Sequence, residues 1–305
     1  CKRLFNWVKI EQIKEICNIT DTTIMKQSSV AIINGKIFTG ERFSSGRAVL
    51  IMDGRIEGLT LSGDIPTDAA VVDARGKYVA PGFIDLQVYG GGHILFAETP
   101  TTAAIDAIAE ALVRSGTTGF LITLATNTPE VIDQALDTLR TYSHPALLGL
   151  HLEGPYLNPE KRGAHPAEYI RQPEPKELSD LVSRAGGSLT MMTIAPERFD
   201  AASLAPLLDA GVLLSAGHSA ATFAEATAGF AAGIGAVTHL FNAMSPFHHR
   251  DPGLPGAVFR SEQVRASIIA DGIHVDYQTL AISKQLLGDR LFLITDAVAE
   301  SSRGI

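Results

Sequence analysis

Cysteine and tryptophan are nearly absent from this 305-residue sequence, and both types are confined to its beginning. The two cysteines are Cys1 and Cys17, and the single tryptophan is Trp7. Because no cysteine follows residue 17, disulfide bonds cannot hold the main body of the chain together. Such cysteine usage is typical of a protein in a reducing cytoplasm, so we expect a cytoplasmic location.

The same scarcity marks a break in composition at Met25. Residues 1–24 carry both cysteines and the tryptophan, and Lys9 and Glu11 interrupt any apolar core of a signal peptide. We therefore take residues 1–24 as an N-terminal extension and Met25 as the working start. A short additional helix in this segment is the alternative interpretation.

Positive charge and long apolar runs are also scarce. The chain has 25 basic and 33 acidic residues, a net charge of −8. Such a field repels phosphate backbones, so we expect no nucleic-acid partner, and an anionic ligand would need a local basic pocket. No apolar stretch approaches the roughly 20 residues that span a bilayer, so no membrane partner is expected either. With 46% hydrophobic and 19% charged residues, the composition is that of a globular protein.

Two patterns follow one another along the chain. Residues 25–76 contain short β-like runs, with Asn34-Gly35 and Asp53-Gly54 as hairpin turn signals, and predict the N-terminal part of a small β domain. In residues 77–305, apolar runs alternate with helical stretches, which is typical of a parallel sheet built from βα units.

One helical stretch shows the pattern clearly. Apolar side chains recur at i, i+3, i+4 and i+7 from Ile105 to Leu112. Thr101 and Thr102 are candidate caps, and Gly116 ends the helix before the next apolar run.

Eight apolar runs are candidate parallel strands. They lie at 78–88, 119–124, 147–153, 188–195, 212–218, 235–240, 265–271 and 291–296. Eight βα strands predict an α/β fold of the (β/α)₈ TIM-barrel type, with its chemistry at the carboxyl ends of the strands. A doubly wound open sheet is the main rival. It is weakened because no G-x-G-x-x-G follows the first strand, and the GGGH sequence at 90–93 lacks that spacing.

Four of these runs end in a residue that can bind metal or move a proton: Glu153, His218, His239 and Asp296. Two imidazoles and one carboxylate form a three-ligand site with an open position, the pattern of a catalytic zinc or a similar divalent ion. A separate carboxylate, Asp296, could then take a proton from water as a general base. This set predicts a hydrolase, while His151 is expected to hydrogen-bond beneath the site instead of binding metal.

Three loops that follow these strands suggest how a substrate could be held. His165 lies on the loop 161–166, and Arg250 follows His248 and His249 in the sequence MSPFHHRDPG. Arg suits an anion such as phosphate, because its planar guanidinium donates two parallel hydrogen bonds. His248 and His249 are interpreted as surface residues. Asp271 and His274 lie at the barrel rim and could serve either as ligand contacts or as loop caps.

Six motifs occur in the same order as in one known family. They are HLEGPYLNPEKRGAH (151–165), SAGHSAAT (215–222), THLFNAM (238–244), DPGLPGA (251–257), ADGIHVD (270–276) and ITDA. From about Val30 to Ala297, the chain resembles the N-acetylglucosamine-6-phosphate deacetylases of the amidohydrolase superfamily. The resemblance implies hydrolysis of the acetamide of N-acetylglucosamine 6-phosphate to glucosamine 6-phosphate and acetate.

The resemblance also implies roles for individual residues. The metal ligands would be Glu153, His218 and His239, and the acid and base would be Asp296, with His165 polarising the carbonyl. Further substrate contacts would come from Ala164, Asn242, Ala243, Arg250, Asp271 and His274, with Arg250 and His274 at the phosphate. Because such an arginine can come from the neighbouring subunit in this family, a homodimer is implied.

The first strand departs from the pattern of two-metal amidohydrolases. Where those proteins carry His-x-His, this chain has Gln87 and Tyr89, and no lysine that could bridge two metals follows in the fourth strand. A single divalent ion per subunit is therefore favoured, with zinc as the leading candidate and iron or another divalent ion as alternatives. His93 is interpreted as a loop residue.

The end of the chain is a second departure. Family members continue for several dozen residues beyond the TDA motif, whereas this sequence stops at Ile305. We therefore expect a barrel that lacks its last helix and a β-sandwich domain that is incomplete. Two other functions stay open on the sequence: a single-metal amidohydrolase acting on another N-acyl or cyclic amide, and an inactive, truncated barrel fragment.

Overall fold

The computed structural model describes residues 29–299, which fall into two compact units. One unit holds the described residues up to Ile84 together with Glu110–Gly119, and the other holds Asp85–Ala109 and the chain from Phe120 onward. The extension proposed for residues 1–24 lies outside the described residues. Each unit is considered by itself below.

The N-terminal residues form two small sheets. The larger has the order β5-β4-β1-β6 and the smaller the order β3-β2-β7. Their strands are β1 (Ser29–Ile33), β2 (Lys36–Phe38), β3 (Phe43–Ser44), β4 (Ala48–Met52), β5 (Arg55–Thr60), β6 (Ala70–Asp73) and β7 (Tyr78–Val79). The short β-like runs of the sequence thus become a small β unit.

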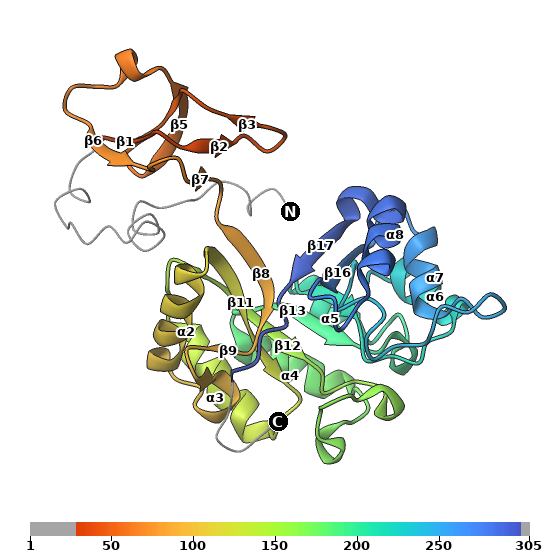
Figure 1. Cartoon of the computed structure of the whole chain (residues 1–305). Coiled ribbons are helices and arrows are strands. Elements are labelled where there is room, and N and C mark those ends of the chain that lie inside the picture. Colours follow the sequence, from red (N-terminus) through yellow and green to blue (C-terminus); the bar gives the residue numbers. More distant parts are fainter. Residues whose placement is uncertain (1–28, 300–305) are drawn as a thin grey trace. The chain divides into compact units, whose positions relative to one another are not determined.

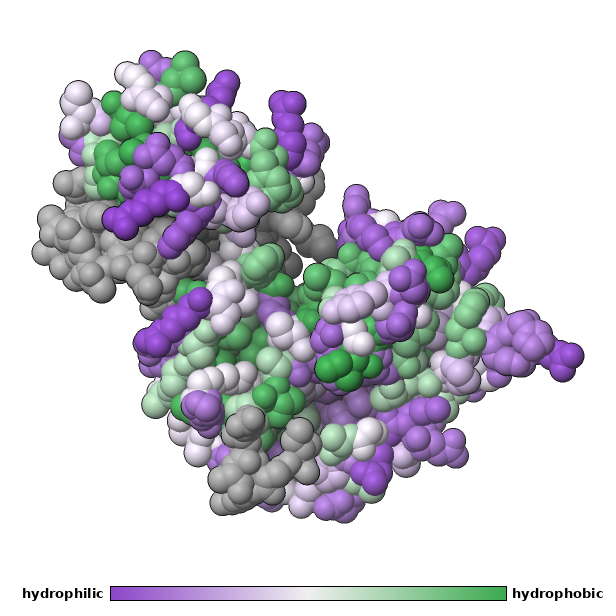
Figure 2. Space-filling model, in the orientation of Figure 1, coloured by the Kyte–Doolittle hydropathy of each residue, from purple (hydrophilic) through white to green (hydrophobic). Residues whose placement is uncertain are grey.

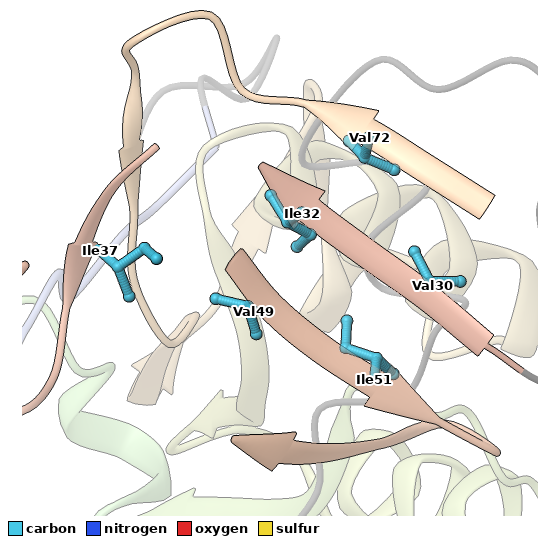
Figure 3. Packing of buried hydrophobic residues seen from close by; sticks show 6 residues of the cluster. All are labelled: Val30, Ile32, Ile37, Val49, Ile51 and Val72. Carbon is cyan, nitrogen blue, oxygen red and sulfur yellow. The ribbon is translucent and has the colours of Figure 1, made fainter. Parts of the chain in front are cut away.

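A compact apolar core holds this β unit together. Its six buried members come from four strands and point toward one another in Figure 3: Val30, Ile32, Ile37, Val49, Ile51 and Val72. β1 lies between β4, which it pairs antiparallel, and β6, which it pairs parallel. Since β1 is the central strand, its branched side chains contact neighbours on both sides, as β-branched residues do well in a sheet.

Of the two predicted hairpin turns, one is confirmed and one is wrong. Asp53 and Gly54, with φ of 47° and 78°, join the antiparallel strands β4 and β5. Asn34-Gly35 joins β1 to β2, but these strands belong to different sheets. The chain passes so close to β7 at this turn that a Cβ on Gly35 would lie 2.5 Å from Val79 Cγ2. The turn therefore redirects the chain between sheets instead of closing a hairpin.

The second architecture is an eight-stranded parallel sheet, and the prediction of a (β/α)₈ barrel is confirmed. The strands follow one another in chain order across the sheet. They are β8 (Phe83–Val88), β11 (Thr117–Ala125), β12 (Leu147–Glu153), β13 (Leu189–Ile194), β14 (Leu213–Ala216), β15 (Ala236–Val237), β16 (Arg265–Ile269) and β17 (Leu291–Ile294). A minor hairpin, β9 (Gly90–Gly91) with β10 (Ile94–Leu95), follows β8.

A helix follows each of the first seven barrel strands, and these helices lie outside the strands (Figure 1). They are α2 (Thr102–Arg114), α3 (Pro129–Thr141), α4 (Pro175–Ala185), α5 (Ala205–Asp209), α6 (Phe223–Ala231), α7 (Gly253–Arg260) and α8 (Tyr277–Leu287). The stretch predicted from Ile105 to Leu112 is α2, and the Thr101 hydroxyl accepts a hydrogen bond from Ala104 N at 3.3 Å. Among residues 29–299, no helix combines the length and apolarity needed to cross a membrane.

The first predicted strand, 78–88, is interrupted. Residues 78–79 form β7 in a small sheet, and the barrel strand β8 begins only at Phe83. Pro81 lacks the N–H that a continuous strand would use. At Gly82, a Cβ would lie 2.1 Å from Thr118 Oγ1, so the close approach of the chain requires glycine there.

A buried carboxylate joins the two ends of the barrel sheet. Asp85 in β8 accepts hydrogen bonds from Thr295 N at 3.2 Å, from Thr295 Oγ1 at 2.5 Å and from Gln87 N at 3.2 Å. Next to it, Val88 forms a parallel bridge with Ala297, where Tyr89 N donates to Ala297 O at 2.9 Å. These bonds connect the first strand to the segment after the last, and so bring Gln87 beside Asp296.

Substitution of Asp85 by Ala should lower the free energy of unfolding by roughly 3 kcal/mol. It leaves buried donors of Thr295 and Gln87 without an acceptor, and each such loss costs about 1–3 kcal/mol. Chemical denaturation of the purified chain measures this, with D137A, an exposed aspartate of α3, as the matched control. An unchanged denaturation midpoint for D85A would show that the barrel closes without this carboxylate.

Candidate active site

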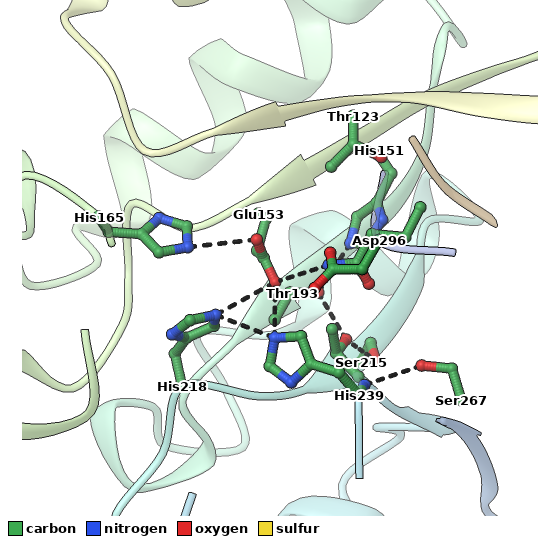
Figure 4. A network of polar contacts seen from close by, with 12 residues as sticks. Thr123, His151, Glu153, His165, Thr193, Ser215, His218, His239, Ser267 and Asp296 are labelled. Atoms are coloured by element: carbon green, nitrogen blue, oxygen red, sulfur yellow. Dashed lines mark hydrogen bonds and ion pairs between the residues drawn. The ribbon is translucent and has the colours of Figure 1, made fainter. Parts of the chain in front are cut away.

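The four predicted strand-end residues come together at the carboxyl edge of the barrel (Figure 4). Glu153 is the last residue of β12, and the other three follow the ends of β14, β15 and β17 by two residues. His218, His239 and Asp296 have φ of 47°, 34° and 56°, in the left-handed region. Such conformations cost about 1–3 kcal/mol each for residues other than glycine and cluster at functional sites.

Three nitrogen and oxygen atoms in this group form a nearly equilateral triangle. Glu153 Oε1 lies 3.3 Å from His218 Nε2 and 3.2 Å from His239 Nε2, and the two Nε2 atoms are 3.0 Å apart. Ligands of a tetrahedral ion with bonds of about 2.1 Å lie about 3.4 Å from one another. The triangle therefore has nearly the size of one face of a metal coordination shell.

The hydrogen bond on the far side of the His218 ring decides which nitrogen is free. His218 Nδ1 lies 2.8 Å from the carbonyl oxygen of Lys161, which can only accept, so Nδ1 carries the hydrogen. Burial lowers the pKa of His218 and keeps the ring neutral. Its Nε2 therefore presents a lone pair to the triangle, as a metal ligand must.

Glu153 is 1% exposed and carries a negative charge. Burial alone would raise its pKa, but the imidazoles of His218, His165 and His239 around it hold that pKa well below its usual range. Burial likewise opposes a charge on His239, yet the Glu153 and Asp296 carboxylates outweigh it and raise the pKa of His239. A buried carboxylate beside two imidazoles is a donor set that a divalent ion accepts.

His165 also belongs to this cluster, but its ring hydrogen lies on Nε2, the nitrogen that faces Glu153. His165 Nδ1 accepts a hydrogen bond from Thr126 N at 3.2 Å, so in the neutral ring the hydrogen is on Nε2. That Nε2 points at Glu153 Oε2 from 3.2 Å. By distance alone, Glu153, His165 and His218 could hold a metal ion together. The hydrogen-bonding pattern instead makes His165 a donor.

A side-chain amide lies between the two carboxylates of the site. Gln87 Nε2 is 2.8 Å from Asp296 Oδ1, 3.2 Å from Glu153 Oε1 and 2.9 Å from Tyr89 Oη. Since an amide carries two hydrogens, it donates to two of these acceptors at a time. Burial, and then the charge of Glu153, raise the pKa of Asp296 to about 6. Asp296 thus stands beside the triangle as a group that can hold or release a proton near neutral pH.

The contact of Tyr89 was not anticipated from the sequence. Its hydroxyl donates to Glu153 Oε2, the oxygen that does not face His218 and His239. Only the position of Tyr89, where related two-metal sites carry a histidine, pointed to this residue. Gln87 and Tyr89 together surround Glu153 with hydrogen-bond donors on the side of the first strand.

His151 lies beneath the site with both ring nitrogens engaged. Nδ1 is 2.9 Å from Leu86 O and Nε2 is 2.7 Å from Thr193 Oγ1. Burial lowers the pKa of His151 to about 4, so the ring is neutral. The hydrogen-bond network continues from Thr193 Oγ1 to Thr238 Oγ1 at 2.7 Å and from there to Ser215 Oγ at 2.6 Å. The expected hydrogen-bonding role of His151 beneath the site is confirmed.

Two residues predicted to contact a substrate lie near the cluster on the loop after β15. Asn242 and Ala243 follow His239, and Ala243 has a φ of 48°. The Asn242 Nδ2 atom is buried and has no hydrogen-bond acceptor among residues 29–299. Because a buried donor without a partner costs free energy, this amide is suited to a ligand oxygen. Ala164 is exposed on the opposite loop, directly before His165.

The predicted pair on the loop after β16 is joined by a hydrogen bond. Asp271 Oδ2 lies 2.7 Å from His274 Nδ1, and Asp271 Oδ1 accepts from Ile273 N and His274 N at 2.8 and 2.9 Å. The hydrogen bond from His274 lowers the pKa of Asp271 to about 2. Asp271 therefore caps the loop and holds the ring of His274 through Nδ1.

A long loop between β15 and α7 projects from the barrel and is strongly hydrophilic at its end (Figures 1 and 2). Arg250 belongs to this loop. Backbone hydrogen bonds between His248 and Asp251, both 3.1 Å, close a turn within it. Arg250, His248 and His249 are exposed, and the contacts described for this chain do not join Arg250 to Glu153 or His218. His93, with a φ of 67°, lies in the turn between β9 and β10, as expected of a loop residue.

A separate cavity of about 520 Å³ lies on the outside of the barrel between α3 and α4. Leu152 and Tyr156 line it from the strand side, and Arg171 and Glu177 line it from the loop and helix. None of the strand-end residues lines this cavity. Its position on the helix-facing side of β12 separates it from the cluster at the carboxyl edge.

The sequence model of the amidohydrolase family matches residues 78–305, and a parallel barrel with such a cluster at its carboxyl edge fits this class of protein. The N-acetylglucosamine-6-phosphate deacetylase of Haemophilus influenzae is 38% identical over 273 residues, which cover 88% of this chain and 71% of that protein. The chain therefore belongs to the N-acetylglucosamine-6-phosphate deacetylase family.

Solved structures show the same likeness. The crystal structure of N-acetylglucosamine-6-phosphate deacetylase from Pasteurella multocida matches with a TM-score of 0.84 and 36% identity, over 89% of this chain and 72% of that one. A mutant of the enzyme from Mycobacterium smegmatis, in complex with N-acetyl-D-glucosamine-6-phosphate, matches with a TM-score of 0.79 and 31% identity, over 90% and 72%. The human deacetylase is 37% identical, and this chain spans 59% of its length.

Proposed function

We propose that this protein hydrolyses the acetamide of N-acetylglucosamine 6-phosphate to glucosamine 6-phosphate and acetate. The observation that carries the proposal is the convergence of Glu153, His218 and His239 with Asp296 at the edge of the barrel. Membership of the deacetylase family supplies the substrate. The deacetylation of such a sugar is a step of amino-sugar breakdown, and we place it in the cytoplasm.

We further propose one divalent metal ion per subunit, held by Glu153 Oε1, His218 Nε2 and His239 Nε2. The donor set fits: one buried anion and two imidazoles within 3.3 Å of one another, with a lone pair on His218 Nε2. Zinc is the leading candidate, and iron or another divalent ion accepts the same ligands. Gln87 and Tyr89, which donate to Glu153 in place of a His-x-His pair, support a single ion.

When bound, a divalent ion would polarise the acetyl carbonyl and lower the pKa of the attacking water. Asp296 accepts the proton of that water and later returns it to the leaving amine, as its raised pKa allows. His165 donates from Nε2–H to the carbonyl oxygen as negative charge develops there. Ala164 lies by the acetyl group and the sugar. Asn242 and Ala243 contact the substrate near its phosphate end, where the buried Asn242 Nδ2 supplies a donor.

At the other end of the substrate, Arg250 and His274 bind the phosphate. His274 is oriented for this by Asp271, and Arg250 lies in the exposed turn that His248 and Asp251 close. The contacts described for this chain do not join Arg250 to the cluster. We therefore propose a homodimer in which Arg250 of each subunit reaches the site of the other subunit.

The substrate assignment is tested by comparing N-acetylglucosamine 6-phosphate with the unphosphorylated sugar. We expect kcat/KM to fall by about 10²–10⁴ without the phosphate, because two charge-assisted contacts are worth roughly 1.5–3 kcal/mol each. Acetate release by the metal-loaded chain measures this. The variants R250A and H274A should lower kcat/KM for the phosphorylated sugar and leave the unphosphorylated one nearly unchanged. Equal rates on both sugars would favour a different N-acyl or cyclic amide as substrate.

A further inference from the structure

Glu197, on the short loop after β13, accepts three hydrogen bonds from two other loops. Its Oε1 accepts from Ala220 N at 2.7 Å and from Asn158 Nδ2 at 2.9 Å, and its Oε2 accepts from Ser219 Oγ at 2.7 Å. The carboxylate is half-buried in the turn Pro196–Arg198. Hydrogen bonds to a charged acceptor are about twice as strong as neutral ones. One side chain thus joins the loops that follow β12, β13 and β14.

Both of these partner loops hold His218. Asn158 N donates to the carbonyl oxygen of His218 at 2.9 Å, and Lys161 O accepts from His218 Nδ1 at 2.8 Å. Ser219 and Ala220 follow His218 directly in the chain. Glu197 therefore connects the loop after β12, which holds both the ring and the carbonyl oxygen of His218, to the residues that follow His218 in the chain.

The backbone of His218 needs such support. Its φ of 47° lies in the left-handed region, where a residue with a side chain remains only when its surroundings hold it there. If this backbone relaxed, the ring would rotate, and the distances of 3.0 and 3.3 Å from His218 Nε2 to His239 and Glu153 would lengthen.

We propose that Glu197 is a positioning residue for His218, which ties the loops after β12 and β14 together so that His218 Nε2 stays in the metal-binding triangle. This inference rests on the proposed assignment of His218 as a metal ligand. Glu197 touches neither the triangle nor Asp296 in the contacts described, so it acts through His218.

The test measures zinc affinity of the full, metal-stripped chain by competition with a chromogenic chelator. We expect E197A to weaken zinc binding by about 10–100-fold, the usual cost of losing a partner behind a metal ligand. E197Q should recover most of the affinity, because its carbonyl oxygen can still accept from Ala220 and Asn158 and its amide can donate to Ser219 Oγ. E160A, an exposed glutamate on the Asn158 loop, is the matched control and should bind like the parent.

If E197A is poorly folded, S219A should weaken zinc binding several-fold. It removes the hydrogen bond from Ser219 Oγ to Glu197 and the one that Ser219 Oγ accepts from Ala221 N at 3.0 Å. Parental affinity in folded E197A, or equal losses in E197A and E197Q, would overturn the positioning role. A parent chain that binds zinc but releases no acetate would contradict the proposed function while leaving the Glu197 result intact. A parent chain that binds no zinc would overturn the ligand assignment and this inference together.

Discussion

Replacement of Asp296 by Asn should lower kcat by about 10²–10⁴ while leaving the metal in place, because general acid–base catalysis contributes an effect of this size. An asparagine can accept the hydrogen bond from Gln87 Nε2 that Asp296 accepts at 2.8 Å, so the local geometry is kept. It cannot take a proton from water or deliver one to the leaving amine. Metal analysis of the purified variant, beside an acetate-release assay, separates the two functions.

The matched control is D289N, which alters a fully exposed aspartate in the turn before β17. It should have parental turnover and metal content. Parental turnover in D296N would refute the role of Asp296 as acid and base. Loss of metal in D296N would instead place Asp296 among the ligands, beside the triangle of Glu153, His218 and His239.

The second prediction with a large effect compares substitutions of His239 and His165, two histidines that lie equally close to Glu153. His239 Nε2 and His165 Nε2 are each 3.2 Å from a Glu153 oxygen. We expect H239A to lose more than about 100-fold in zinc affinity, because removing a ligand should exceed the 10–100-fold cost of removing a partner behind one. H165A should retain zinc and lose about 10²–10³ in kcat, the usual cost of removing one donor to a developing oxyanion.

Equilibrium competition with a chelator gives the zinc affinities, and kcat is measured at saturating zinc, so that the two effects are not confused. The comparison is internally matched, since both changes remove a buried imidazole from the same cluster. If H165A loses zinc and H239A keeps it, the ligand set is Glu153, His165 and His218, and the hydrogen on His165 Nε2 is misplaced.

Local patterns predicted the barrel well because most of its strands lie within apolar runs, although β8 carries the polar Asp85 and Gln87. The run 147–153 is β12 residue for residue, and the helix from Ile105 to Leu112 lies within α2. Burial of both faces of a parallel strand makes such runs easy to recognise. The hairpin at Asn34-Gly35 failed for the opposite reason. A turn signal describes four residues, whereas the pairing of β1 with β4 and β6 depends on strands far along the chain.

Some residues of the candidate site could likewise be predicted from the sequence, and others could not. Glu153, His218, His239 and Asp296 could be chosen from the sequence because parallel strands direct their carboxyl ends to one edge of a barrel. The contacts that Tyr89, Glu197 and Asp85 make could not be predicted from the sequence. Each acts through a hydrogen bond to a residue on another strand or loop, such as Tyr89 to Glu153 and Asp85 to Thr295.

The sequence by itself determined the class of fold, the order of the strands and the residue types at their ends. These follow from short apolar runs that alternate along the chain with helical stretches. Only the tertiary structure decided which imidazole offers a lone pair and which offers a hydrogen. That choice depends on Lys161 O behind His218 and Thr126 N behind His165. A proton occupies one ring nitrogen or the other according to what lies within about 3 Å of it, and the folded chain alone sets those distances.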